Sequence, residues 1–199
     1  GFDADTPLLG WSMTKSVMAT LIGMRISEAK MDLQRDHLLP EWEGDDRSKI
    51  KLADLLGMQS GLKFDEDYGN VTDVTRMLFL ENNMTEFAAS LPLEAQPGTK
   101  FNYSSGTANI LSKLYMESFD TPEEAFTYAQ KVLFEPLGIA SATLEADASG
   151  IFVGSSYLYA NARDWLSIAR LLLDKGKVGD KQLLSEDFVR LMQTPATAS

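Results

Sequence analysis

One strongly apolar helix constrains the fold of this chain more than any other feature. From Ser12 to about Ala29, apolar residues recur at the spacing of an α-helix, in a stripe wide enough to bury most of the helix surface. The stripe comprises Val17, Met18, Leu21, Ile22 and Met24. A helix that hides most of its surface needs neighbours on several sides, so we expect the other elements to pack around it.

The composition is that of a globular protein and disfavours several kinds of partner. Hydrophobic residues make up 44% and charged residues 24% of the 199 residues, which is enough for one sizeable core. The net charge is 18 − 29 = −11, so we expect no binding to nucleic acid or to an anionic membrane surface. The apolar stretches are far shorter than the roughly 18 residues that span a bilayer.

The scarcity of Cys and His narrows the chemistry. Without Cys the chain cannot form a disulfide, a thiol nucleophile, an iron–sulfur cluster or a thiolate zinc site. Its one His, His37, rules out a His-rich metal site, and we interpret it as a residue at a helix end or on the surface. A serine enzyme built from this chain therefore needs a base other than histidine.

Beyond the first helix, the pattern predicts a helix-rich chain with little strand. Further helices are predicted at residues 49–56, 71–81, 86–91, 104–118 and 121–134, then from the cap Asn161 to a point before Gly176, and from Ser185 to Gln193. Short strands are predicted at residues 142–145 and 150–153. No internal repeat or low-complexity linker divides the chain, so we expect residues 1–199 to belong to one domain.

An acidic segment begins like a calcium-binding EF-hand loop, with Asp65, Glu66 and Asp67. Position 6 of such a loop would be Asn70 rather than Gly, and position 12 would be Arg76 rather than Glu. We therefore interpret the segment as a solvated acidic loop.

The pattern Ser-x-x-Lys offers a way to activate serine without histidine. On a helix the two side chains share a face, and a desolvated Lys can accept a proton or act as a cation that lowers the pKa of the serine. Chance predicts about one such pair in a chain of this composition. Four occur: Ser12/Lys15, Ser27/Lys30, Ser48/Lys51 and Ser60/Lys63.

The surrounding sequence favours the first pair. Ser27 lies among polar residues near a helix end, Ser48 in a charged run and Ser60 in a turn. Ser12 begins the strongly apolar helix, whose free N–H groups can stabilise an oxyanion, and Lys15 follows one turn later. The alternative is that Ser12 is only a helix cap and Lys15 only a solvated charge.

Five segments, in order along the chain, resemble the serine β-lactamase and penicillin-binding-protein superfamily. The resemblance is to its class C-like branch of esterases, D-aminopeptidases and 6-aminohexanoate-oligomer hydrolases. Residues 8–17 resemble the nucleophile segment, and residues 52–62 the segment LLxxxSGL. Residues 97–105 are similar to PGxxFxYSN, residues 134–139 to PLGM and residues 160–165 to xTARDxxRF. Together these segments cover nearly the whole chain.

The resemblance implies a role for each matching residue. Ser12 matches the acylated nucleophile, and Lys15 matches its activating partner. Tyr103 matches the tyrosine of the Tyr-x-Asn motif, which would exchange protons between Ser12, the leaving group and the deacylating water. Two other tyrosines match Tyr-x-Asn more literally, at residues 68–70 and 159–161, but both lack the Pro-Gly-Thr that precedes Tyr103. No metal or cofactor is implied.

Ser105 stands where this motif has Asn. A hydroxyl donates one hydrogen bond, whereas an amide both donates and accepts, so recognition of a substrate carbonyl in the β-lactam manner is disfavoured. We therefore expect Ser105 to bind substrate in an esterase or linear-amide hydrolase rather than in a true β-lactamase.

The resemblance also implies an α+β fold of the β-lactamase/transpeptidase type, of which this chain holds mostly the helical lobe with few short strands. The opening strands and the strand with the third motif, Lys-Thr-Gly or His-x-Gly, do not occur in the sequence. We therefore expect residues 1–199 to form an incomplete β-lactamase-like domain that is inactive by itself. A periplasmic or secreted location is compatible with the resemblance.

The function implied is that of a serine hydrolase that forms an acyl-enzyme on a small-molecule ester or amide, either a β-lactam or a linear amide. Two alternatives stay open. One is a non-catalytic penicillin-recognising or interaction module of the same fold, and the other is a helical binding domain with accidental motifs.

Overall fold

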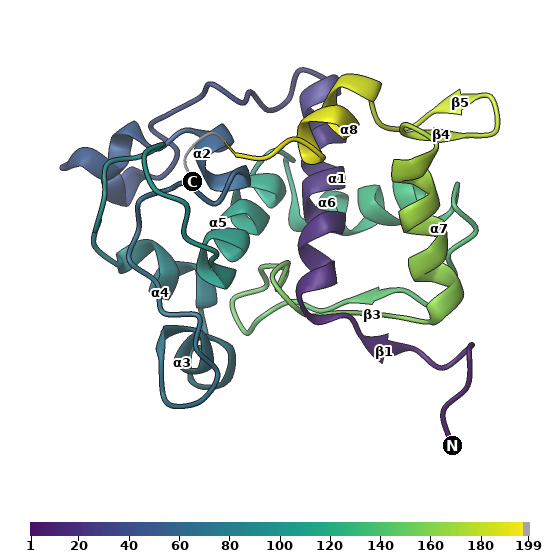
Figure 1. Cartoon of the computed structure of the whole chain (residues 1–199), viewed down its shortest axis with the longest axis horizontal. Coiled ribbons are helices and arrows are strands. Elements are labelled where there is room, and N and C mark those ends of the chain that lie inside the picture. The colour runs from purple at the N-terminus through teal and green to yellow at the C-terminus, as the bar shows by residue number, and fades with distance from the viewer. Residues whose placement is uncertain (197–199) are drawn as a thin grey trace.

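The structure, a computed structural model, describes residues 1–196 and is rich in helix (Figure 1). The α-helices are α1 Thr14–Ser27, α2 Leu52–Leu56, α3 Asp73–Leu80, α4 Met84–Ser90, α5 Ser105–Met116, α6 Pro122–Ala129, α7 Ala162–Leu173 and α8 Glu186–Met192. Short 3₁₀ turns lie at η1 Trp11–Met13, η2 Pro40–Trp42 and η3 Asp46–Lys49, and η4 Gln130–Phe134 is a π-helix. The strands are β1 Leu8–Leu9, β2 Thr143–Leu144, β3 Leu158–Ala160, β4 Lys177–Val178 and β5 Lys181–Gln182.

Helix α1 runs through the middle of the molecule, as its apolar stripe predicts (Figure 1). Helices α2 to α5 lie on one side of it, and α7 lies on the other. Val17, Leu21 and Ile22 are fully buried, and α5 packs against α1, α2, α3, α4 and α6. The two central helices α1 and α5 therefore share the core and bring their N-terminal residues to one region.

Most predicted helices are present, and side-chain caps explain where several of them begin. Ser104, Thr121, Asn161 and Ser185 each accept a hydrogen bond from the backbone N–H three residues later. The helix predicted at residues 121–134 comprises α6 and then the wider π turn of η4. The one predicted at residues 49–56 is shorter, because the backbone is extended at the fully buried Ile50.

The larger sheet has three antiparallel strands in the order β1-β3-β2. Leu9 of β1 and Thr143 of β2 both pair with Tyr159 of β3, so β3 is the central strand. Strands β4 and β5 form a separate two-stranded hairpin. Three short strands beside a mainly helical chain agree with the α+β fold that the resemblance implies.

The prediction of a strand at residues 150–153 is wrong. This segment makes only an isolated bridge between Ala146 and Phe152. The Asp147 carboxylate accepts hydrogen bonds from the backbone N–H groups of Ser149 and Ile151, and so closes a turn instead of a strand ladder. Phe152 is buried, which explains the apolar run without a strand. Strand β2 lies within the predicted segment 142–145, whereas the sequence pattern did not predict β1, β3, β4 or β5.

Within residues 1–196, the helices are too short or too polar to cross a bilayer.

Candidate active site

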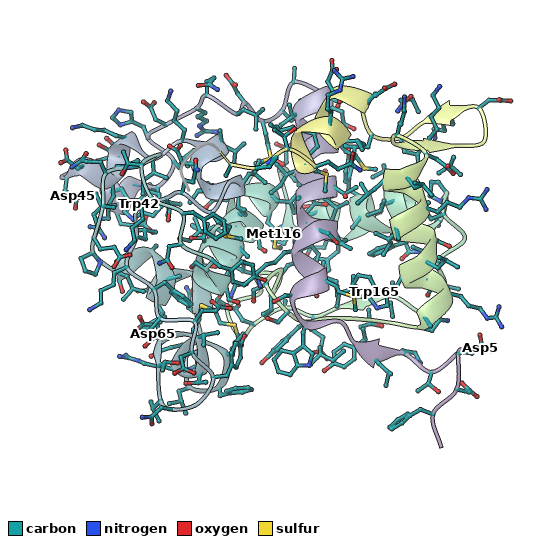
Figure 2. The ribbon with its side chains drawn as sticks, in the orientation of Figure 1. Asp5, Trp42, Asp45, Asp65, Met116 and Trp165 are labelled. Atoms are coloured by element: carbon teal, nitrogen blue, oxygen red, sulfur yellow. The ribbon has the colours of Figure 1, made fainter. Side chains whose placement is uncertain are left out.

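Ser12 lies in a tight turn that leads into α1. The turn η1 places it between Trp11 and Met13, with its side chain exposed to solvent. Trp11 has a φ of 46°, a left-handed conformation that costs a bulky residue energy and is often found beside functional groups. Gly10, which precedes this turn, packs closely against Trp165 of α7 (labelled in Figure 2), since a Cβ at Gly10 would lie only 2.2 Å from the Trp165 ring.

Lys15 lies one helical turn after Ser12 and joins it to two other parts of the chain. Its Nζ donates hydrogen bonds to Ser12 Oγ at 3.0 Å, to Ser105 Oγ at 3.1 Å and to the carbonyl oxygen of Ser155 at 2.9 Å. An ammonium group has three N–H donors and no acceptor. All three donors of Lys15 are therefore used, and one of their acceptors is the hydroxyl of Ser12.

The surroundings of Lys15 make it an unusual lysine. Burial of the side chain lowers its pKa from 10.5 to about 8, and the negative charge of Glu66 opposes this shift. A lysine with a pKa near 8 is neutral often enough at physiological pH to accept a proton. The electrostatics at Lys15 thus suit it to proton transfer.

Ser105 is fully buried at the start of α5 and is held by Glu66. The Glu66 carboxylate accepts the Ser105 hydroxyl at 2.5 Å through Oε1 and the Ser105 backbone N–H at 2.7 Å through Oε2. Glu66 belongs to the segment that we interpreted as a solvated acidic loop, and that interpretation is wrong for this residue. Its neighbours Asp65 (Figure 2) and Asp67 are also acidic but are exposed, so acidic character alone could not single out Glu66.

Two tyrosines border the Ser12 region. Tyr103, which is 40% exposed, places its ring 5.0 Å from Lys15 Nζ, measured to the ring centroid. Burial raises the pKa of the Tyr68 hydroxyl, and the negative charge of Glu66 acts in the same direction. The rings of Tyr68 and Trp11 form a T-shaped pair, with the two centroids 6.3 Å apart. Tyr159, the third tyrosine considered, lies in β3.

The Ser155 carbonyl is positioned by the segment that precedes β3. Asn109 of α5 accepts the backbone N–H of Ser155 through Oδ1 at 3.1 Å. Gly154 allows this segment to pass close to the core, since a Cβ there would lie 2.2 Å from Ser112 Oγ and 2.4 Å from a Met18 carbon. Neither contact is visible in the sequence, because the residues are far apart along the chain.

The serines of the other three Ser-x-x-Lys pairs, and His37, make hydrogen bonds or contacts that need no catalytic explanation. The hydroxyl of Ser27 donates to the carbonyl oxygen of Gly23, and that of Ser48 to the carbonyl oxygen of Asp45. Ser60 is buried, with its hydroxyl 3.4 Å from that of Thr107. His37 is exposed and lies 2.8 Å from Glu43, measured from Nδ1 to Oε2, which agrees with a surface role. In residues 1–196, no three acidic or His side chains gather where they could hold a metal ion.

The site therefore brings together all four residues that the sequence singles out. Ser12 and Ser105 both accept hydrogen bonds from Lys15, and the ring of Tyr103 lies beside Lys15. It adds Glu66, which the sequence did not predict. When a hydroxyl lies next to a lysine of lowered pKa, the hydroxyl oxygen can attack a carbonyl carbon and the lysine can accept the proton that is released.

Comparison with solved structures shows what this fold is similar to. A protein designated a 6-aminohexanoate-dimer hydrolase from Bacillus anthracis superimposes with a TM-score of 0.83 at 20% identity, over 96% of this chain and 53% of that one. Simvastatin synthase from Aspergillus terreus gives 0.74 at 21% identity, over 100% and 59%. A penicillin-binding protein from Bacillus halodurans gives 0.76 at 16% identity, over 99% and 68%.

These likenesses concern the fold, and the chain spans only about half the length of the B. anthracis protein. The sequence itself matches the family model for β-lactamase over residues 1–199. Because that match covers every residue and the solved structures share the same architecture, this chain belongs to the β-lactamase family of hydrolases.

Proposed function

We propose that this chain carries the nucleophile and the proton-transfer groups of a serine hydrolase that acts on a small-molecule ester or amide. The observation that carries the proposal is Lys15, which is shared between the hydroxyls of Ser12 and Ser105 and has a pKa of about 8. Membership of the β-lactamase family supports it.

In the proposed reaction, Ser12 Oγ attacks the carbonyl carbon of the substrate and its proton passes to neutral Lys15. The proton then moves to the leaving alcohol or amine, with Tyr103 as the relay, and an ester between Ser12 and the acyl group remains. A water molecule attacks this acyl-enzyme, loses its proton to the same groups, and releases a carboxylic acid and free Ser12. Each step uses only the substrate, water and groups of the chain.

The substrate class proposed is an ester or a linear amide in preference to a β-lactam. Ser105 supports this preference, because its only proton is directed to Glu66 and its lone pairs face Lys15. It therefore lacks the free N–H that an amide side chain would offer to a substrate carbonyl. A non-catalytic module of the same fold is the alternative that the experiment below distinguishes.

Covalent labelling tests the proposal. The full-length product of the gene and these 199 residues are each incubated with a fluorophosphonate, and the mass of the intact protein is measured. On the full-length protein we expect one adduct on Ser12, which is lost in Ser12→Ala and retained in Ser48→Ala, a variant without the serine of another Ser-x-x-Lys pair. Absence of an adduct on the full-length protein would refute the hydrolase and favour the non-catalytic module. Turnover of p-nitrophenyl esters against a chromogenic cephalosporin then separates an esterase from a β-lactamase.

A further inference from the structure

The hydroxyl of Ser105 has only one proton, and the structure shows where that proton goes. Lys15 Nζ donates to Ser105 Oγ at 3.1 Å, so Ser105 must act as an acceptor toward Lys15. Its own proton is directed to Glu66 Oε1, 2.5 Å away. The result is a continuous chain of donors and acceptors that runs from the Lys15 ammonium through the Ser105 hydroxyl to the Glu66 carboxylate.

Glu66 is held in place for this contact by both of its oxygens and by its loop. The second carboxylate oxygen accepts the backbone N–H of Ser105 at 2.7 Å. The loop is tied to the start of α3, because the backbone N–H of Asp65 donates to the Asp73 carboxylate at 2.9 Å and that of Val74 donates to the Asp65 carbonyl oxygen at 3.0 Å. Glu66 is therefore fixed in a defined place and is not a freely solvated charge.

The direction of the Ser105 proton matters once Lys15 is neutral. A neutral amine has one lone pair, and any nearby hydroxyl can donate to it. If Ser105 were free to turn, it would compete with Ser12 for that lone pair. With its proton committed to Glu66, Ser105 leaves the lone pair to the hydroxyl of Ser12. After the proton transfer, the same chain of contacts stabilises the Lys15 cation.

We propose that Glu66 is a positioning residue for the acylation step, which acts through Ser105 to direct the Lys15 lone pair to Ser12 and to stabilise the Lys15 cation that forms. A role of Glu66 in acylation rests on the proposed function, because it requires that Ser12 be the nucleophile. The charge coupling between Glu66 and Lys15 is measurable whether or not the chain turns over a substrate.

Among the groups around Lys15, Glu66 is the one whose charge acts on the pKa of Lys15. These groups are the hydroxyls of Ser12 and Ser105, the carbonyl oxygen of Ser155 and the ring of Tyr103, with Glu66 as the charge that acts on it. The hydroxyl of Tyr68, whose pKa burial and the charge of Glu66 both raise, belongs to the same loop as Glu66. Removing the charge of Glu66 should therefore make the cationic form of Lys15 less favourable.

The test measures the titration of Lys15 directly in Glu66→Gln. Competitive acetylation at pH 6 to 11, followed by mass spectrometry of the Lys15 peptide, gives the midpoint of its titration. We expect the midpoint to move to lower pH in Glu66→Gln and to stay unchanged in the control Asp67→Asn, which neutralises a carboxylate of the same loop. The fluorophosphonate reaction at Ser12 should fall by roughly tenfold in Glu66→Gln even at a pH where Lys15 is neutral.

Circular dichroism confirms that each variant is folded, and Ser105→Ala provides a second route that leaves Glu66 in place. Removing the hydroxyl breaks the same chain of contacts, so Glu66→Gln should have little further effect on labelling in that background. An unchanged Lys15 midpoint in folded Glu66→Gln, or additive effects in the double variant, would overturn the proposal. Failure of Ser12 to react at all would instead count against the hydrolase, and the Lys15 titration would still decide the role of Glu66.

Discussion

The reaction of Ser12 with a fluorophosphonate should follow the protonation of Lys15. With a pKa of about 8, Lys15 is neutral in about one molecule in eleven at pH 7 and in about ten of eleven at pH 9. A lysine at the ordinary value of 10.5 would be neutral in only about one molecule in three thousand at pH 7. If neutral Lys15 is the base, the labelling rate should rise about tenfold between pH 7 and pH 9 and then level off.

The assay is the rate of adduct formation at Ser12, measured by intact mass from pH 6 to 10 and corrected for hydrolysis of the reagent at each pH. Lys15→Arg is the matched control, because a guanidinium keeps its charge throughout this range and should abolish the rise. A rate that does not change between pH 7 and 9, or one that still climbs about tenfold between pH 9 and 10, would refute the assignment of neutral Lys15 as the base.

Three further predictions concern stability and are each tested by urea unfolding. Lys15→Met should raise the free energy of unfolding at pH 7 by about 1–3 kcal/mol, because the fold holds the pKa of Lys15 below its unfolded value. Between pH 8 and 10.5 the unfolded wild-type chain binds more protons than the folded one, so the free energy of unfolding of the wild type rises with pH. The difference in stability between Lys15→Met and the wild type should therefore shrink over this range. A difference that does not change with pH would contradict the lowered pKa of Lys15. Gly154→Ala should lower stability by about 1–3 kcal/mol, since its Cβ would overlap Ser112 Oγ, and a wild-type value would show that the segment can shift freely. Asn161→Ala should lower it by about 1 kcal/mol by removing the cap on the Asp164 backbone N–H, whereas Asn161→Asp should retain most of it.

The sequence by itself determined the features that depend on short spacing along the chain. The stripe of α1 and the Asn161 cap of α7 follow from residues within a few positions of each other, and the structure confirms them. The same holds for Ser12 and Lys15, because a separation of three residues on a helix brings two side chains together whatever the rest of the chain does. The proximity of Ser12 and Lys15 can therefore be predicted from the sequence around them alone.

Only the tertiary structure decided which groups surround that pair. Ser105 lies 90 positions and Ser155 140 positions from Lys15, and both reach it because α1 and α5 pack in one core and β3 follows the buried segment at Gly154. Glu66 is acidic like its neighbours Asp65 and Asp67, but only its carboxylate contacts Ser105, because the loop and α3 hold it there. Long-range packing leaves no periodic trace in a single sequence, so the nucleophile could be predicted from the residues while its supporting contacts required the fold.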